Sequence, residues 1–494
     1  MSNIIAIDQG TTSSRTIIFD DRGSVISHAQ REFKQFYPKN GWVEHDLDEI
    51  WKTQVETILE AFNNSSLKIS DIASIGITNQ RETLAVWERK TGNPLHRAIV
   101  WQDRRTANLI SKMKNEKMEK EIRQKTGLPL DPYFSGTKIK WILDNCPEIY
   151  DKAKRGEVCF GTIDSWLIYK LTNGEKFLTD VTNASRTLLM DINKGHWDKE
   201  LTELMGIEID WLAEILPSSG YFGETNILGS SVPINSTVGD QQSALFGQFC
   251  FQIGDVKNTY GTGCFILAYT GKNRVESSNN LLTTIAWQLS NNPIEYALEG
   301  SVFIGGAAIQ WLRDGLEIIE NSIDVNQLAE TVNDTKGVYV VPAFTGLGAP
   351  YWNPKARGII TGLTRGTTKA HIARAVLESI ALQSAEVIQG ISNDLDSPVL
   401  SIRADGGASA SNLLMNMQAD YSGCKVLRPS SLETTALGTA LLAALGKGLY
   451  SSPNELSKVI KPEKTFLPKI NKEKREKKLR EWKKVVSAVT FLTN

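Results

Sequence analysis

One pattern occurs twice in this chain and limits the folds that it can adopt. An apolar strand at residues 4–7 runs into a turn of small hydroxyl and glycine residues, and a second strand follows at 16–19. The sequence VKNTYGTGCFILAYTG, residues 256–271, repeats this order of strand, turn and strand. Matching turns in corresponding places of two half-chains predict a duplicated α/β domain, with the boundary near residues 245–255.

Each half continues with strands and helices. In the first half we expect a third strand at about 24–29, a helix that begins with a capping box of Asp46 and Glu49, and a buried strand at 71–78. In the second half a long helix at about 371–391 precedes a strand and two glycine-bearing helices. The C-terminal segment predicts a surface helix with one apolar stripe and a charged face exposed to solvent. The alternative is that the charged face binds a partner. The apolar stripe consists of Leu479, Trp482, Val486 and Val489.

Composition excludes several classes of protein. The net charge is −1, and 41% of the 494 residues are hydrophobic, so nothing favours binding to nucleic acid or to an acidic membrane. No window holds about 18 consecutive apolar residues, and the first residues lack the pattern of a secretory leader. The five cysteines never form a CxxC pair, which favours reduced thiols. We therefore expect a cytoplasmic protein without a membrane span.

The first turn carries an acidic residue that needs an explanation. Asp8 ends an apolar strand, and an unpaired buried carboxylate costs roughly several kcal/mol. A positive group is therefore expected beside it, and Mg²⁺ bound through water is one candidate. The backbone N–H groups and hydroxyls of the turn could surround a phosphate, whose charge Arg15 could neutralise. An ordinary hairpin with a turn aspartate is the alternative.

Three glycine-bearing segments in the second half could serve the same ligand. The turn at 259–265 would face the first turn across a cleft, and its key residues would be Thr262 and Gly263. The segments FIGGAAIQ and ADGGAS each place two glycines where a helix begins, and the dipole there favours anions. Glycines that serve only close packing are the alternative.

These motifs resemble those of a known superfamily. Asp8-Gly10-Thr11-Thr12, Tyr260-Gly261-Thr262-Gly263 and Asp405-Gly406-Gly407 resemble the two phosphate turns and the adenosine segment of the actin, Hsp70 and sugar-kinase superfamily. Within it, residues 133–145 and 358–378 are similar to both signatures of the FGGY family of carbohydrate kinases. The resemblance extends from residue 3 to about 450 and implies two ribonuclease H-like (actin-like ATPase) domains that face a central cleft.

The resemblance also implies that the two halves bind different parts of the substrates. Residues 1–250 would form the N-terminal domain, with the substrate site and the first phosphate turn. Residues 251–494 would form the C-terminal domain, with the second phosphate turn and the adenosine site. ATP and Mg²⁺ are the implied cofactors, and Asp8 is the implied metal ligand. The implied ATP contacts are Thr11, Thr12, Ser13, Arg15, Thr262, Gly305, Gln310, Gly406, Gly407 and Ser411, the last standing where many relatives have Asn.

Several longer motifs resemble the FGGY members that act on glycerol. They are GITNQRET, DPYFSGTK, GDQQSALFG, YGTGCF and PAFTGLGAPYW. Sugar-specific relatives usually carry Gln-Met-His where this chain has Gln80-Arg81-Glu82. The resemblance implies phosphorylation of glycerol by Mg-ATP to sn-glycerol 3-phosphate and ADP, in glycerol uptake and catabolism. The implied substrate contacts are Arg81, Glu82, Trp101, Tyr133, Asp240, Gln241 and Phe265. The alternative for Arg81 and Glu82 is a surface ion pair, and the alternative for Trp101 and Phe265 is a place in the core.

Asp240 follows an expected strand and opens an expected helix, where an aspartate is often only a cap. The resemblance implies instead that it is the general base for the attacking hydroxyl. A carboxylate of pKa about 4 cannot deprotonate an alcohol of pKa about 15 in advance. In the loose transition state of phosphoryl transfer, however, the proton leaves late, so Asp240 would orient the hydroxyl and accept the proton at the end.

Two other functions remain open on the sequence. One is a kinase for another small polyol or a ketose, and the other is a non-enzymatic ATP-binding switch. We expect a homo-oligomer, either a dimer or a tetramer. Some glycerol-specific relatives are inhibited by fructose 1,6-bisphosphate through a glycine-rich loop that ends in Arg, and others carry a regulatory phosphorylated His. Neither feature is recognised here, since NILGSSVPIN lacks Arg and no His stands between residues 197 and 370.

Overall fold

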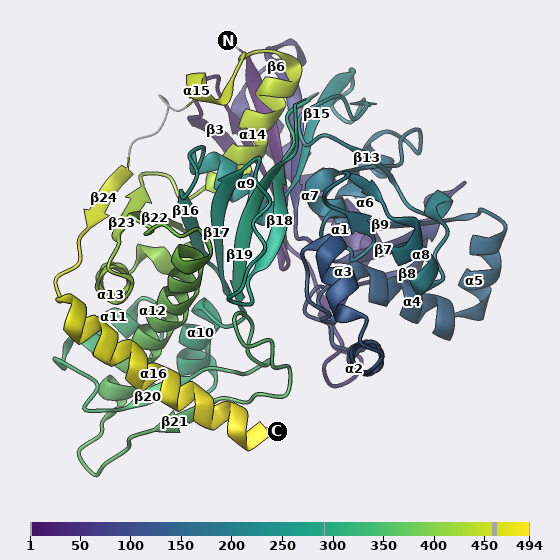
Figure 1. Cartoon of the computed structure of the whole chain (residues 1–494). Coiled ribbons are helices and arrows are strands. Elements are labelled where there is room, and N and C mark those ends of the chain that lie inside the picture. The colour runs from purple at the N-terminus through teal and green to yellow at the C-terminus, as the bar shows by residue number, and fades with distance from the viewer. Residues whose placement is uncertain (1, 291, 457–461, 494) are drawn as a thin grey trace.

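The computed structural model describes residues 2–290, 292–456 and 462–493 and shows two lobes (Figure 1). The first lobe is built on a six-stranded sheet of order β14-β15-β6-β1-β2-β3. Its strands are β1 (Asn3–Gln9), β2 (Ser13–Phe19), β3 (Val25–Glu32), β6 (Ile72–Asn79), β14 (Glu224–Thr225) and β15 (Val232–Gly239). The three strands predicted at the start of the chain are thus confirmed, as is the buried strand predicted at 71–78.

The second lobe repeats this sheet. Its seven strands have the order β18-β19-β17-β16-β22-β23-β24. They are β16 (Val256–Tyr260), β17 (Cys264–Gly271), β18 (Leu282–Trp287), β19 (Glu295–Val302), β22 (Ser401–Asp405), β23 (Lys425–Pro429) and β24 (Pro462–Phe466). In each lobe an antiparallel meander of three strands continues into two parallel strands, β3-β2-β1-β6-β15 in the first and β19-β17-β16-β22-β23 in the second. The shared pattern confirms the duplicated α/β fold.

Helices cover both sheets. Helix α1 (Leu47–Ser65) packs on β2 and β3, and α12 (Lys369–Asp394) packs on β17 and β19. Asp46 caps α1 as predicted, because its carboxylate accepts from the backbone N–H groups of Asp48 and Glu49. The predicted capping box is incomplete, however, since the Glu49 carboxylate accepts from the backbone N–H of Lys34. The other helices of the second lobe are α10 (Gly306–Asp314), α11 (Asp324–Glu330), α13 (Asn412–Ser422), α14 (Thr434–Lys447), α15 (Pro453–Leu456) and α16 (Lys472–Thr493), with the strand pair β20 (Tyr339–Val341) and β21 (Ile359–Thr361).

A smaller layer, built from residues on both sides of β6 in the sequence, completes the first lobe and lies on the right in Figure 1. Its sheet has the order β4-β5-β8-β7-β9, with strands β4 (Gln35–Phe36), β5 (Glu44–His45), β7 (Leu84–Glu88), β8 (Pro94–Ile99) and β9 (Val158–Thr162). Its helices are α2 (Ala107–Asn115), α3 (Glu119–Thr126), α4 (Ser135–Asn145), α5 (Pro147–Lys154), α6 (Ile163–Leu171), α7 (Val181–Ala184) and α8 (Lys199–Met205). Two strand pairs complete it: β10 (Leu178–Asp180) with β13 (Glu214–Leu216), and β11 (Met190–Asp191) with β12 (His196–Trp197).

Two helices in equivalent positions join the lobes. Helix α9 (Asp240–Gly247) follows β15, α14 follows β23, and the two pack on each other. They approach closely at glycines, since a Cβ on Gly438 would lie 1.9 Å from the carbonyl oxygen of Ser243. Helix α14 also packs on β1 and β6, and the Thr439 hydroxyl donates to the carbonyl of Ile77 at 3.0 Å. A helix from the second half of the sequence therefore covers the sheet of the first.

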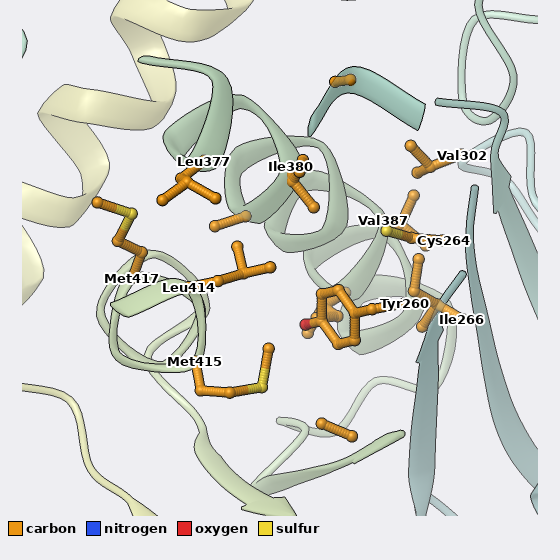
Figure 2. Packing of buried hydrophobic residues seen from close by; sticks show 14 of the residues in the cluster. Tyr260, Cys264, Ile266, Val302, Leu377, Ile380, Val387, Leu414, Met415 and Met417 are labelled. Atoms are coloured by element: carbon orange, nitrogen blue, oxygen red, sulfur yellow. The ribbon is translucent and has the colours of Figure 1, made fainter. Parts of the chain in front are cut away.

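The core of the second lobe holds the glycine-bearing turn that follows β16 in place. Figure 2 shows Tyr260 at the end of β16, surrounded by Ile266, Val387, Leu414 and other buried side chains. The Tyr260 hydroxyl donates to Gln418 Oε1 at 2.8 Å, which ties β16 to α13. The turn that follows Tyr260 thus begins from a rigid anchor.

The C-terminal helix α16 lies along the outside of the second lobe (Figure 1). Its predicted apolar stripe is buried against residues of β20 and α12; its members are Leu479, Trp482, Val486 and Val489. The prediction of a surface helix with one apolar stripe is confirmed. In the described part of the chain, no helix is both long enough and apolar enough to span a bilayer.

Candidate active site

A cavity of about 400 Å³ lies between the lobes and brings together every residue predicted to bind the acceptor alcohol. The acceptor cavity, as we call it, is lined by Arg81, Glu82, Trp101, Tyr133, Asp240, Gln241 and Phe265. Thr11 and Thr12 of the first turn and Thr262 and Gln310 of the second lobe complete one side of it. These residues are spread over 300 positions of sequence, so only the fold makes them neighbours.

Sheet topology explains this convergence. Arg81 and Glu82 follow β6, and Asp240 follows β15. Because β6 and β15 are parallel neighbours, with Gly239 opposite Asn79, their carboxyl ends meet at one edge. Glu82 has a φ of 59°, in the left-handed region that a non-glycine residue rarely adopts. Such strain is common where a side chain is held for function.

Three aromatic rings form the apolar wall of the acceptor cavity. Trp101 meets Tyr133 and Phe265 edge to face, with ring centroids 5.7 and 6.0 Å apart. The Trp101 indole N–H donates to the Thr11 hydroxyl at 2.9 Å, which links this wall to the first turn. Burial raises the pKa of the Tyr133 hydroxyl, so this group stays protonated and can donate a hydrogen bond.

A buried network of four charges underlies the cavity. Arg81 donates to both carboxylate oxygens of Glu299 at 2.7 and 2.9 Å. Arg186 donates to Glu82 at 2.6 Å and to Glu299 at 3.1 Å. Burial acts to raise the pKa of Glu299, but the two guanidinium groups outweigh it and lower the pKa to about 2. Arg186 and Glu299 were not predicted from the sequence; a glutamate inside the apolar strand EYALEGSV was the available signal.

Asp240 is placed to act on a ligand. It is the first residue of α9, whose N-cap is Gly239, and 28% of its side chain is exposed. The Nε of Arg81 lies 3.3 Å from its Oδ1. Desolvation by the surrounding protein raises the pKa of Asp240 to about 6; Arg81 opposes this shift and Glu82 adds to it. The carboxylate is therefore ionised at neutral pH and is a stronger base than an ordinary aspartate.

Two buried lysines, also missed from the sequence, hold site residues. Lys257 donates to Gln241 Oε1 at 2.5 Å and to the Thr259 hydroxyl at 3.0 Å, and burial lowers its pKa to about 8. Lys138 donates to the backbone carbonyls of Glu82 and Tyr133 at 2.9 and 2.7 Å, and burial lowers its pKa to about 7. A lone lysine in a strand or helix pattern gives no sign that it points inward.

The positive group expected beside Asp8 is Arg15. The two residues are cross-strand partners in β1 and β2, and Arg15 Nη2 lies 2.8 Å from Asp8 Oδ2. Arg15 Nη1 lies 2.6 Å from Glu433, so this guanidinium joins carboxylates of both halves. Asp8, Ser13 and Arg15 lie next to the first turn but do not line the acceptor cavity. Their predicted contacts with ATP and Mg²⁺ stay predictions.

A second cavity, of about 580 Å³, adjoins the first and shares Gly261, Thr262 and Gln310 with it. Gly407 and Ser411, both predicted to contact ATP, line this cavity, and their contacts with the nucleotide stay predictions. The Ser411 hydroxyl also accepts from the backbone N–H of Leu414 at 3.0 Å and so caps α13.

Gly305 and Gly406 fit the packing alternative better than direct binding. A Cβ on Gly305 would lie 2.7 Å from Cys264 Sγ, and one on Gly406 would lie 2.7 Å from the carbonyl oxygen of Tyr260. Gly406 also has a φ of 81°, which other residues rarely adopt. Neither glycine lines the two cavities, so both act by allowing backbone segments to approach closely.

The site suits a divalent cation that arrives with a nucleotide. Among residues 2–290, 292–456 and 462–493, no group of three or more His, Cys, Asp or Glu side chains is arranged to hold a metal by itself. Mg²⁺ needs few protein ligands, because it keeps several waters and takes one or two carboxylates plus phosphate oxygens. Asp8 and Asp240 supply carboxylates at one sheet edge, since Asp8 is opposite Thr78 of β6.

The chain has a duplicated α/β fold whose halves present facing turns of glycine and hydroxyl residues. A nucleotide-sized cavity adjoins a small polar pocket that contains a carboxylate. Together these features define a two-domain phosphotransferase. The chain belongs to the FGGY family of carbohydrate kinases: the N-terminal domain of that family matches residues 3–247, and its C-terminal domain matches residues 256–446.

Individual relatives extend over the whole chain. The glycerol kinase of Polaromonas sp. (strain JS666) is 54% identical over 492 residues, 98% of this chain and 99% of that protein. Glycerol kinase 2 of Thermotoga maritima is 52% identical over 489 residues, 99% of this chain and 98% of that one. The crystal structure of Plasmodium falciparum glycerol kinase with ADP is 37% identical, covers 99% of this chain and 98% of its own, and superposes with a TM-score of 0.91. A xylulose kinase of Lactobacillus acidophilus, 23% identical, shows the same fold with a TM-score of 0.89 over 99% of both chains.

Proposed function

We propose that this chain transfers the γ-phosphoryl group of Mg-ATP to glycerol and forms sn-glycerol 3-phosphate and ADP. The proposal rests on the acceptor cavity, where Arg81, Glu82 and Asp240 lie beside three aromatic rings. This cavity adjoins a second one that is large enough for a nucleotide. Relatives named glycerol kinase, 52–54% identical over nearly the whole chain, support the same acceptor.

Glycerol matches the chemistry of this cavity. Its three hydroxyls need donors and acceptors, which Arg81, Glu82 and Asp240 provide, and its C–H face can rest against Trp101 and Phe265. Charge-assisted hydrogen bonds of this kind are about twice as strong as neutral ones. A pocket built from charged partners also rejects ligands that would leave those partners unpaired.

Asp240 would act as the general base. It orients one terminal hydroxyl for in-line attack on the γ-phosphorus, and it accepts the proton late, as the new O–P bond forms. Arg81 holds the Asp240 carboxylate from one side, and Gln241, itself held by Lys257, lies next to it. Positioning and charge stabilisation supply most of the rate in reactions of this class.

The two turns would hold the phosphates. Thr11 and Thr12 approach from the first lobe and Thr262 approaches from the second, and all three line the acceptor cavity. When bound with ATP, Mg²⁺ would neutralise charge on the β- and γ-phosphates, with Asp8 and Asp240 as the available carboxylates. Closure of the lobes would exclude water, which otherwise could accept the phosphoryl group in place of glycerol.

An ADP-release assay with glycerol, dihydroxyacetone, xylulose and gluconate tests the proposal. We expect turnover with glycerol to exceed that with every other acceptor, and little ADP release without an acceptor. Faster turnover with a pentulose would contradict glycerol as the substrate. ADP release that is independent of any acceptor would favour an ATP-binding switch. The homo-oligomer is likewise part of this proposal, and light scattering of the purified chain tests whether it is a dimer or a tetramer.

A further inference from the structure

A third cavity adjoins the acceptor cavity through residues other than those shared with the second cavity. Its volume is about 1360 Å³, and we call it the vestibule. It is lined by residues of 37–43, 102–114 and 130–132 from the first lobe and of 344–357 from the second, with Thr490 of α16. Tyr37 and Gln102 line both the vestibule and the acceptor cavity, so the two adjoin each other at these residues.

The vestibule is strongly cationic. Five basic side chains line it, and Asp131 is the one acidic residue among its lining residues; the five are Lys39, Arg104, Lys114, Lys355 and Arg357. Arg104 is paired with Asp131 at 2.6 Å, and Lys114 lies 3.7 Å from Glu119. The remaining three cations therefore contribute most of the positive potential.

Two of these three cations have contacts that leave their charge uncompensated. The Lys39 ammonium lies over the ring of Trp42, 4.6 Å from the centroid. Arg357 donates to the neutral carbonyls of Pro354 and Ala356 at 3.1 and 2.8 Å. A cluster of like charges in a concave wall produces a field that concentrates anions.

The acceptor cavity adjoins the other two cavities through different residues. The nucleotide cavity meets it at Gly261, Thr262 and Gln310, whereas the vestibule meets it at Tyr37 and Gln102. A nucleotide bound at the second turn therefore leaves the vestibule side open.

We infer that the vestibule is a binding site for the phosphate monoester product on its way out of the enzyme. The inference rests on the proposed function, because a neutral alcohol enters the reaction and a phosphate monoester of charge about −1.5 to −2 leaves it. A cationic wall attracts the negatively charged product, whereas the uncharged substrate gains no such electrostatic attraction. Product held in the vestibule blocks the path of the next glycerol molecule while ATP remains bound.

The test measures inhibition by added glycerol 3-phosphate in the forward reaction at saturating ATP. Under that condition the γ-phosphate of ATP occupies the place that the product phosphate would need in the acceptor cavity, so inhibition reports binding elsewhere. We expect the triple variant K39Q/K355Q/R357Q to raise the inhibition constant about fivefold, the effect expected for three charges about 10 Å from a dianion with ionic screening. The KM for glycerol and kcat should stay unchanged.

Two further variants isolate the charge effect. The triple variant K39R/K355R/R357K keeps every charge and should keep the inhibition constant of the original chain. The variant K194Q/K199Q/K472Q removes the same net charge from exposed lysines outside the vestibule and should also leave it unchanged. Raising the salt concentration should weaken inhibition of the original chain more than inhibition of K39Q/K355Q/R357Q.

The outcomes separate this inference from the proposed function. If the chain phosphorylates glycerol but glycerol 3-phosphate does not inhibit at saturating ATP, the vestibule inference is wrong and the function stands. The same follows if K39Q/K355Q/R357Q and K194Q/K199Q/K472Q shift the inhibition constant equally. If the chain does not phosphorylate glycerol, the proposed function is wrong and the inference is overturned with it.

Discussion

Arg81 at the end of β6 donates two hydrogen bonds, at 2.7 and 2.9 Å, to Glu299 in β19 of the other lobe. Both side chains are buried, so this ion pair joins the two halves beneath the cleft. The same guanidinium lies 3.3 Å from Asp240. The orientation of the proposed base therefore depends on a carboxylate supplied by the opposite half.

Glu299→Gln tests this dependence. The change keeps the shape of the side chain but removes the buried negative charge that compensates Arg81 and Arg186. We expect a loss of about 3 kcal/mol in the free energy of unfolding, measured by denaturant titration. The KM for glycerol should rise about tenfold, because Arg81 is no longer held. Glu203→Gln on the exposed face of α8 is the matched control, and equal effects of both changes would contradict the role of Glu299.

Asp240→Asn tests the general base. The amide can still accept a hydrogen bond but cannot take the proton, so we expect kcat to fall about a thousandfold or more. Glycerol binding, measured by calorimetry, should stay within about tenfold of the original chain. A variant that retains most of its kcat would leave Asp240 with a structural role at the start of α9.

The pH dependence of activity follows from the raised pKa of Asp240, about 6. The ionised carboxylate is the active form, so kcat/KM for glycerol should be level above this pKa and fall about tenfold per pH unit below it. An ordinary aspartate, with a pKa of about 3.9, would keep activity level down to about pH 4. Rates measured from pH 5 to 8 on a chain that stays folded distinguish the two cases.

Asp8→Asn tests the expected metal ligand. Because Glu433 still pairs with Arg15, the damage to the fold should be small. We expect the KM for Mg-ATP to rise about tenfold while glycerol binding changes little. Glu433→Gln removes the other partner of Arg15 and is the control. If it raises the KM for Mg-ATP as much as Asp8→Asn does, the effect of Asp8 comes only from its ion pair.

Gly438→Ala tests the crossing of α9 and α14. A Cβ at this position would lie 1.9 Å from the carbonyl oxygen of Ser243, so the two helices must move apart. We expect a loss of about 2 kcal/mol in stability, seen as a lower Tm. Gly366→Ala in the turn before α12 is the control, since its Cβ would lie 3.8 Å from the nearest neighbouring atom. A Tm unchanged by Gly438→Ala would show that the crossing is not tightly packed.

Much of the fold and site could be predicted from local patterns. Strand boundaries, the two turns and the stripe of α16 follow from periodicity within a few neighbouring residues. Most of the acceptor residues could be predicted because they lie in longer motifs, such as Arg81 and Glu82 in GITNQRET or Asp240 in GDQQSALFG; Trp101 lies outside these motifs. The roles of Ser13, Arg15 and Asp8 toward ATP stay predictions, since their side chains do not line the acceptor cavity.

The sequence by itself determined the duplicated α/β plan and the kinds of residue available to the site, because strand and helix periodicity and turn chemistry are properties of neighbours along the chain. Only the tertiary structure decided that Arg81 pairs with Glu299, that Arg15 joins Asp8 to Glu433, and that α14 covers the sheet of the other half. Partners separated by more than 200 residues, as Arg81 and Glu299 are, leave no periodic signal in the sequence. Such residues become neighbours only when the two sheets pack together in the folded chain. A buried charge without a partner costs free energy, so a residue of opposite charge is needed beside it.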